Sequence, residues 1–234
     1  MGISQAPVRK LLENLQNINV RYVNHLFRAA CYYEPCKKAD EFNRWQKKPE
    51  INFHNLLKDS ITRKNTIALD LSAGSPFSAK LQWMSVDEQQ NYLDLLLQEK
   101  KVRTAVGKYS EVRSIYSAEQ FCHNSLDGDE KRTIHLGIDI FAKAGTCIYA
   151  PFDGVVHHLN DNRGHLDYGP TVILKHQPSD GPLFYTLYGH LGRSSLNNLN
   201  IGQLVKGGMP LAEIGNSREN GGWIHHVHFQ IILD

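Results

Sequence analysis

The stretch from residue 134 to residue 232 is a series of short segments in which apolar and polar residues alternate, separated by turn sequences such as DNRGHLDYG and QPSDG. Alternation with a period of two places successive side chains on opposite faces of a strand, so each segment can bury one face only. Short strands at close spacing are typical of an all-β sheet, barrel or sandwich. We therefore expect an antiparallel β domain over residues 114–234.

The first part of the chain follows a different period. Apolar residues between Pro7 and Tyr32 recur at steps of three and four, which predicts an amphipathic helix. A second helix is expected from Lys38 to Gln46, and a third after the sequence SVDE, whose serine and glutamate form a capping box. The segment NTIALDLS, residues 65–72, alternates and predicts a strand. The expected fold class is α+β, with a mainly helical region of unknown role over residues 1–113 before the β domain.

Composition argues against several classes of partner. The 234 residues carry a formal net charge of +2 without clustered lysine and arginine, which gives no reason to expect nucleic acid or an anionic membrane as partner. No apolar run approaches the ~18 residues of a membrane-spanning helix. Four scattered cysteines are too few for a disulfide framework. The N-terminus lacks a secretion signal, so we expect a cytoplasmic protein or a piece of a longer chain.

Histidine is distributed unevenly along the chain. Residues 131–234 hold nine of the twelve histidines, whereas residues 1–113 show no catalytic motif. Imidazole is a common metal ligand and exchanges protons near neutral pH. A functional site is therefore expected in the β domain.

The segment IHLGIDI, residues 134–140, alternates throughout. One face carries His135, Gly137 and Asp139, and the missing side chain of the glycine leaves room for something to be held between the other two. The opposite face is apolar and is expected to lie in the core, with Ile134, Leu136, Ile138 and Ile140.

The terminal segment WIHHVHFQI, residues 223–231, also reads as a strand. His226, His228 and Gln230 share one face, with the two imidazoles about 7 Å apart. The other face is apolar, with Val227, Phe229 and Ile231. His225 lies on the core side or precedes the strand.

Two imidazoles and one carboxylate are a suitable ligand set for catalytic zinc, because three protein ligands leave a fourth position for water. The pair His135 and Asp139 with one histidine of the H-x-H sequence would complete such a site. His190 ends the strand LFYTLYGH, where Tyr188 shares its face, and is available for proton transfer. Either pattern alone is also met by a surface histidine bonded to an aspartate, but the two together favour a metal.

Four other histidines have weaker claims to the site. His157 and His158 are adjacent, so at most one can face it. His165 and His176 lie in or beside turns and are expected to be solvated or near the rim of a cleft.

The motifs of the β domain resemble those of the lysostaphin-like zinc metalloendopeptidases. The matching blocks, in the expected order over about residues 132–234, are HLGIDIFAKAGTCIYAPFDGVV, DYGPTVILKH, YTLYGHL, IGQLVKGGMPLAEIG and HVHFQI. The resemblance implies a β-sheet sandwich with a groove over the zinc ion. It also implies that the zinc ligands are His135, Asp139 and His228.

The resemblance further implies that His226 and His190 lie beside the metal-bound water, as general base or as stabilisers of an oxyanion. Tyr188 is another candidate donor to that oxyanion. The chain departs from the family at Trp223-Ile224-His225, where a small residue or proline is common, and at the loop NSRENGG. Both departures touch the groove wall and therefore bear on substrate preference.

The expected function is that of a zinc-dependent endopeptidase acting on peptides, of the glycine-rich or cell-wall type that the family cuts. The sequence contains no H-E-x-x-H motif, so histidine replaces the usual glutamate base. The alternatives are a non-catalytic binding or regulatory module, or a carrier domain of similar β-architecture. Residues 1–113 resemble the region before such modules in multidomain proteins that also contain a kinase-like and a class-III aminotransferase module, so flanking domains are expected.

Overall fold

The computed structural model describes residues 37–113, 122–125, 128–131 and 134–233. The helix predicted between Pro7 and Tyr32 lies outside these ranges. Within them, no helix has the length and apolar character needed to cross a membrane.

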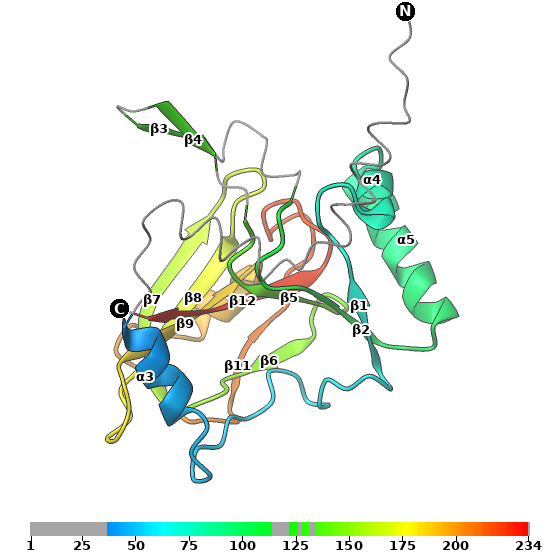
Figure 1. Ribbon diagram of the computed structural model, residues 1–234. Coiled ribbons are helices and arrows are strands. Elements are labelled where there is room, and N and C mark those ends of the chain that lie inside the picture. The colour runs from blue at the N-terminus through cyan, green and yellow to red at the C-terminus, as the bar shows by residue number, and fades with distance from the viewer. Residues whose placement is uncertain (1–36, 114–121, 126–127, 132–133, 234) are drawn as a thin grey trace, which may run out of the picture.

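An eight-stranded sheet forms the body of the molecule (Figure 1). Every neighbouring pair of strands is antiparallel except the first pair, which is parallel. In spatial order the strands are β1 (Thr66–Leu69), β2 (Thr104–Gly107), β5 (Ile138–Phe141), β12 (His226–Leu233), β9 (Phe184–Gly189), β8 (Gly169–His176), β7 (Gly154–Asn162) and β10 (Leu204–Val205).

A second, two-stranded sheet packs on this body and forms the sandwich that the sequence predicts. It consists of β6 (Cys147–Tyr149) and β11 (Pro210–Glu213), which lie below the large sheet in Figure 1. Ile148 of β6 and Leu211 of β11 share one buried cluster with Ile140, Val172 and Val227 of the large sheet. A separate hairpin of β3 (Cys122–Ser125) and β4 (Gly128–Lys131) projects from the body.

The helices within the described residues are α3 (Lys37–Trp45), α4 (Pro76–Leu81), α5 (Val86–Glu99) and α6 (Arg193–Asn197). α3 and α5 confirm two predicted helices, and α5 begins with the predicted capping box, in which Ser85 and Glu88 each accept a backbone N–H of the other. Leu93 of α5 is 1% exposed and packs with Ala105 of β2 and Phe141 of β5. Burying one such leucine contributes about 1.5–3 kcal/mol.

The region before residue 114 contributes two strands to the large sheet. β1 confirms the strand predicted over residues 65–72, whereas β2 was not predicted, because four residues, TAVG, are too short to show a period. β2 pairs with β5 through Val106 and Ile140. Residues on both sides of position 114 therefore build one sheet.

The strand predicted over residues 134–140 begins later than expected. β5 starts at Ile138, and Leu136 is 54% exposed, so the prediction that Leu136 faces the core is wrong. The reason is long-range pairing: the backbone of His135 bonds to Ser110 and Glu111 instead of continuing β5.

Candidate metal centre

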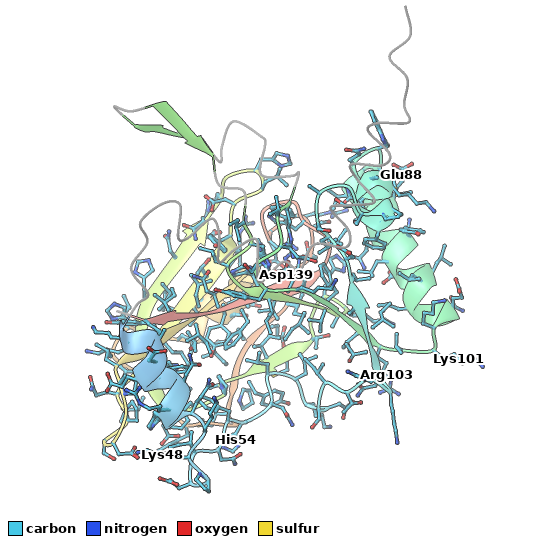
Figure 2. The ribbon with its side chains drawn as sticks, in the orientation of Figure 1. Lys48, His54, Glu88, Lys101, Arg103 and Asp139 are labelled. Atoms are coloured by element: carbon cyan, nitrogen blue, oxygen red, sulfur yellow. The ribbon has the colours of Figure 1, made fainter. Side chains whose placement is uncertain are left out.

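The pairing of β5 with β12 brings Asp139 and His228 together. The two residues are direct partners in the antiparallel register, so their side chains leave the sheet on the same face. Oδ1 of Asp139 lies 3.1 Å from Nδ1 of His228. Figure 2 shows Asp139 near the centre of the molecule, beside β5.

His135 completes a triangle with this pair from the segment just before β5. Its Nε2 lies 2.9 Å from Nδ1 of His228 and 3.1 Å from Oδ1 of Asp139. All three residues are buried, with at most 4% of their surface exposed. Within the described part of the chain, they are the only group of three such side chains that converges closely enough to share a metal ion.

The hydrogen bonds around the two rings decide which nitrogens face the triangle. His135 can donate Nδ1–H to the carbonyl oxygen of Lys108 at 3.0 Å, and His228 can donate Nε2–H to Oε1 of Gln230 at 3.3 Å. These bonds leave lone pairs on Nε2 of His135 and Nδ1 of His228, directed at a carboxylate oxygen. Three acceptor atoms this close repel one another unless a cation lies between them.

The triangle fits zinc in size as well as in chemistry. Ligand atoms at ~2.0–2.1 Å from a tetrahedral zinc lie about 3.3 Å from one another. The three distances here are 2.9, 3.1 and 3.1 Å. The three atoms would move apart by a few tenths of an ångström around the ion, and two imidazoles with one carboxylate leave a fourth position.

Gly137 provides the room that the sequence analysis expected, and the ring of His228 fills it. A Cβ at this position would lie 2.6 Å from Cε1 and Nε2 of His228 and 2.6 Å from the carbonyl oxygen of Phe229. A side chain here would therefore displace a ligand or the β12 backbone.

His226 and His190 lie beside the triangle and resemble each other in their bonding. Nδ1 of His226 is 2.7 Å from the carbonyl oxygen of Ile224, and Nδ1 of His190 is 2.8 Å from that of Asn220. The carbonyls accept from Nδ1–H, so each Nε2 is left as an acceptor. Nε2 of His226 is 3.7 Å from Oδ1 of Asp139. The ring centres of His226 and His190 are 4.4 Å apart.

Burial keeps both of these imidazoles neutral. Desolvation lowers the pKa of His226 to about 4, against the opposing charge of Asp139. Desolvation, followed by the charges of His226 and His228, holds the pKa of His190 well below its usual value. At neutral pH both rings are therefore uncharged, with Nε2 as an acceptor.

Asp139 stays ionised in this buried setting. Burial opposes its charge, but the charges of His226 and Arg113, followed by the polar contacts with His135 and His228, outweigh that penalty and hold the pKa of Asp139 well below its usual value. The carboxylate is therefore available as an anionic ligand.

His190 has an unusual backbone. Its φ is 62°, in the left-handed region that non-glycine residues seldom adopt. Hydrogen bonds fix it there: its N–H donates to the carbonyl of Tyr168, and its own carbonyl accepts from Gly215. Such local strain commonly occurs at functional sites.

Tyr188, the predicted oxyanion donor, does not reach the site. It is fully buried in the core, pairs with Phe229 on the opposite face of β12, and accepts a hydrogen bond from the Thr186 hydroxyl at 3.0 Å. Desolvation raises the pKa of its phenol. The expectation that Tyr188 shares a face with His190 is wrong, because the backbone turns at His190.

Two aromatic side chains that were not assigned a role line the site instead. Tyr168 stacks against His190 at 5.8 Å between ring centres and lies edge-on to His228 at 5.2 Å. Trp223 lies 5.6 Å from His190 and donates its indole N–H to the carbonyl of Asp167. Tyr168 belongs to the DYGP block. The only sign in the sequence that this residue lies near the site was that the block occurs in the order expected for the family.

Asn220 is a buried residue that the sequence analysis also missed. It is fully buried, and its side-chain oxygen accepts the N–H groups of Gly222 and Trp223. Its amide group donates to the carbonyl of Trp223 at 3.0 Å. Asn220 thus holds the loop that positions both Trp223 and the carbonyl bonded to His190.

The histidines with weaker claims lie elsewhere. His157 and His158 are exposed on β7, and His165 is exposed in a pocket of about 240 Å³ that it shares with Arg163, Arg193 and Arg218. His176 was expected to be solvated or near the rim but is fully buried, which is a correction. Another pocket, of about 790 Å³, lies along α5 and is lined by none of the candidate site residues.

Comparison with known proteins supports the resemblance inferred from the motifs. Residues 133–234 match the model of peptidase family M23, which confirms a lysostaphin-like C-terminal half. An uncharacterized metalloprotease of Haemophilus influenzae is 32% identical over 100 residues, which span 43% of this chain and 19% of that protein.

Two solved structures are similar in part. A zinc-containing peptidase from Vibrio cholerae is 23% identical with a TM-score of 0.35, over 53% of this chain and 33% of that one. The catalytic domain of the antimicrobial peptidase lysostaphin from Staphylococcus simulans is 24% identical with a TM-score of 0.34, over 42% of this chain and 67% of that one.

Proposed function

We propose that this chain, whose residues 133–234 match peptidase family M23, is a zinc-dependent endopeptidase. The observation that carries the proposal is the convergence of Nε2 of His135, Oδ1 of Asp139 and Nδ1 of His228 within 2.9–3.1 Å of one another. These atoms would hold the ion. When bound, zinc supplies a Lewis acid that polarises the scissile carbonyl and makes water a better nucleophile near neutral pH.

His226 and His190 would move the protons. Each neutral ring presents Nε2 as an acceptor, because Nδ1–H is bonded to a backbone carbonyl. The same carbonyl stabilises the imidazolium after Nε2 accepts a proton from the attacking water. That ring can then protonate the leaving amine.

Tyr168 and Trp223 would position the peptide. Both rings pack against His190, at 5.8 and 5.6 Å between ring centres, and so lie beside the proton-transfer groups. Aromatic rings at this place would exclude water and orient the backbone of a bound substrate. We propose peptides of the glycine-rich or cell-wall type as substrates, because the match to peptidase family M23 implies them.

A cleavage screen tests this proposal. The purified chain, loaded with one equivalent of zinc, would be incubated with a peptide library that includes oligoglycine and muropeptides. We expect cleavage that stops on addition of a chelator and returns with zinc, and that is ~10²–10⁴-fold slower in zinc-loaded His226→Ala. One tightly held zinc without cleavage of any substrate would favour a non-catalytic binding module instead.

A further inference from the structure

The segment over residues 108–113 contacts the metal ligands although it precedes the part of the chain that matches the peptidase family. The carbonyl of Lys108 accepts from the His135 ring at 3.0 Å. The N–H of Ser110 donates to the carbonyl of His135, and the N–H of His135 donates to the carbonyl of Glu111, both at 2.8 Å. Residues 108–111 therefore fix both the backbone and the imidazole ring of the candidate ligand His135.

Arg113 reaches the carboxylate ligand from the same segment. Its Nη1 donates to Oδ2 of Asp139 at 2.5 Å, and its Nη2 and Nε donate to Oε2 of Glu111 at 3.0 and 3.2 Å. Only 10% of the Arg113 side chain is exposed. Gly107, the β2 partner of Asp139, leaves space for the guanidinium, since a Cβ there would lie 2.9 Å from Nη2.

The two carboxylate oxygens of Asp139 have different partners. Oδ2 is bonded to the guanidinium, and Oδ1 faces the nitrogens of His135 and His228. A carboxylate held by one oxygen cannot rotate, so the other oxygen is fixed for a single bond to a metal. Outer partners of metal ligands commonly change metal affinity or activity ~10–100-fold when they are removed.

Glu111 balances the charge that Arg113 brings. Its Oε1 accepts the N–H of Leu71 at 3.1 Å, and only 6% of its side chain is exposed. The buried group of Asp139, Arg113 and Glu111 has a formal charge of −1, from two carboxylates and one guanidinium. A site with that charge attracts a divalent cation, whereas the arginine without its glutamate would cancel the charge of the ligand.

We infer that Arg113 is a positioning residue for the metal ligand Asp139, and that residues 108–113 complete the metal centre from outside the matched peptidase region. The inference rests on the proposed function in taking Asp139 as a metal ligand. The forked shape of the Arg113 guanidinium is needed as well as its charge, because a single ammonium group cannot bond both Asp139 and Glu111 in this geometry.

The test compares the full chain with Arg113→Met and Arg113→Lys. The dissociation constant for zinc would be measured by competition with a chromophoric chelator, and the visible spectrum of the Co²⁺-substituted protein would report the geometry of the ligands. Arg103→Met is the matched control, since Arg103 is 90% exposed, 4.0 Å from Asp59, and points away from the molecule in Figure 2.

We expect Arg113→Met to bind zinc ~10–100-fold more weakly, with weakened or shifted Co²⁺ bands, and Arg113→Lys to fall between it and the unmodified chain. Arg103→Met should match the unmodified chain. Unchanged zinc affinity and an unchanged Co²⁺ spectrum in Arg113→Met would overturn the inference. If Arg113→Met does not fold, Arg113→Lys decides, and values equal to those of the unmodified chain would overturn it. Failure of the unmodified chain to bind zinc would instead refute the proposed function.

Discussion

His176 and the histidines of the metal centre are equally buried but differ in how the protein satisfies their rings. Both nitrogens of His176 have protein partners, the carbonyl of Asp153 at 2.8 Å and the hydroxyl of Thr186 at 2.7 Å. Its ring also stacks on Phe184 with 4.6 Å between centres. In the metal centre, only Nδ1 of His135 is bonded to a carbonyl oxygen. Its Nε2 faces two further acceptors, Nδ1 of His228 and Oδ1 of Asp139.

The difference separates structural histidines from candidate ligands. Burial alone does not distinguish them, because all of these rings are at most 5% exposed. What distinguishes them is whether a lone pair is left over and whether several lone pairs converge. Substitutions in the two settings should therefore change different properties, and the following experiments test that division.

The largest effect is expected from His228→Ala. It removes the nitrogen that lies within 3.1 Å of both other ligand atoms. We expect loss of stoichiometric zinc and of all metal-dependent cleavage, measured by metal analysis and by the peptide assay. Stoichiometric zinc in this variant would show that the ligand set is wrong.

Gly137→Ala should also abolish the site without removing any ligand. The added Cβ would meet the His228 ring and the carbonyl oxygen of Phe229, each at 2.6 Å. The backbone oxygen cannot move aside as a flexible side chain can, so we expect loss of zinc and a lower melting temperature. Gly164→Ala is a milder control, because its Cβ would meet only the Asp167 side chain at 3.2 Å. Equal zinc affinity in both variants would contradict the packing argument.

His226→Ala should separate metal binding from turnover. The ring is not one of the three ligands, but its Nε2 lies 3.7 Å from Asp139. Loss of a general acid–base group commonly lowers the rate ~10²–10⁴-fold. We expect kcat to fall by that factor while metal analysis still gives one zinc per chain. Full turnover would refute the role of His226.

The smallest effect is expected from His176→Gln, and on stability rather than on zinc. Desolvation lowers the pKa of His176 in the folded protein below its value of about 6.5 in the unfolded chain. As the pH falls below 6.5, the unfolded state binds a proton that the folded state does not, so the free energy of unfolding declines by up to ~1.4 kcal/mol per pH unit.

Urea unfolding of the metal-free chain between pH 7.5 and pH 5 measures this contribution. His176→Gln should lower stability at pH 7.5 by about 1–3 kcal/mol, because a buried partner is lost, and should show a shallower decline towards acid. Zinc affinity should not change. A decline as steep as in the unmodified chain would show that His176 is not the group that titrates.

The alternating pattern was sufficient to single out the candidate ligands because it is local, although the choice of His228 over His226 rested on the resemblance to the lysostaphin-like peptidases. A period of two places His226 and His228 on one face of β12 wherever that strand lies in the fold. His135 reaches Asp139 from the segment before β5, which begins only at Ile138. The same rule failed for Tyr188, because the left-handed backbone of His190 ends the alternation and no residue type signals it.

The remaining errors came from contacts between residues distant in sequence. His176 is beside a turn, yet Asp153, 23 residues away, and Phe184 enclose it. The contact of Arg113 with Asp139 joins residues 26 apart and depends on β2, which is too short to show a pattern. Sequence periodicity carries no information on such pairings.

X-ray absorption at the zinc edge, on the purified chain loaded with one equivalent of zinc, tests the central claim most directly. The account predicts about four nitrogen and oxygen ligands at ~2.0–2.1 Å, of which two are imidazoles, and loss of one imidazole or of the metal in His228→Ala. Sulfur ligands, four imidazoles, or no tightly bound zinc would contradict it.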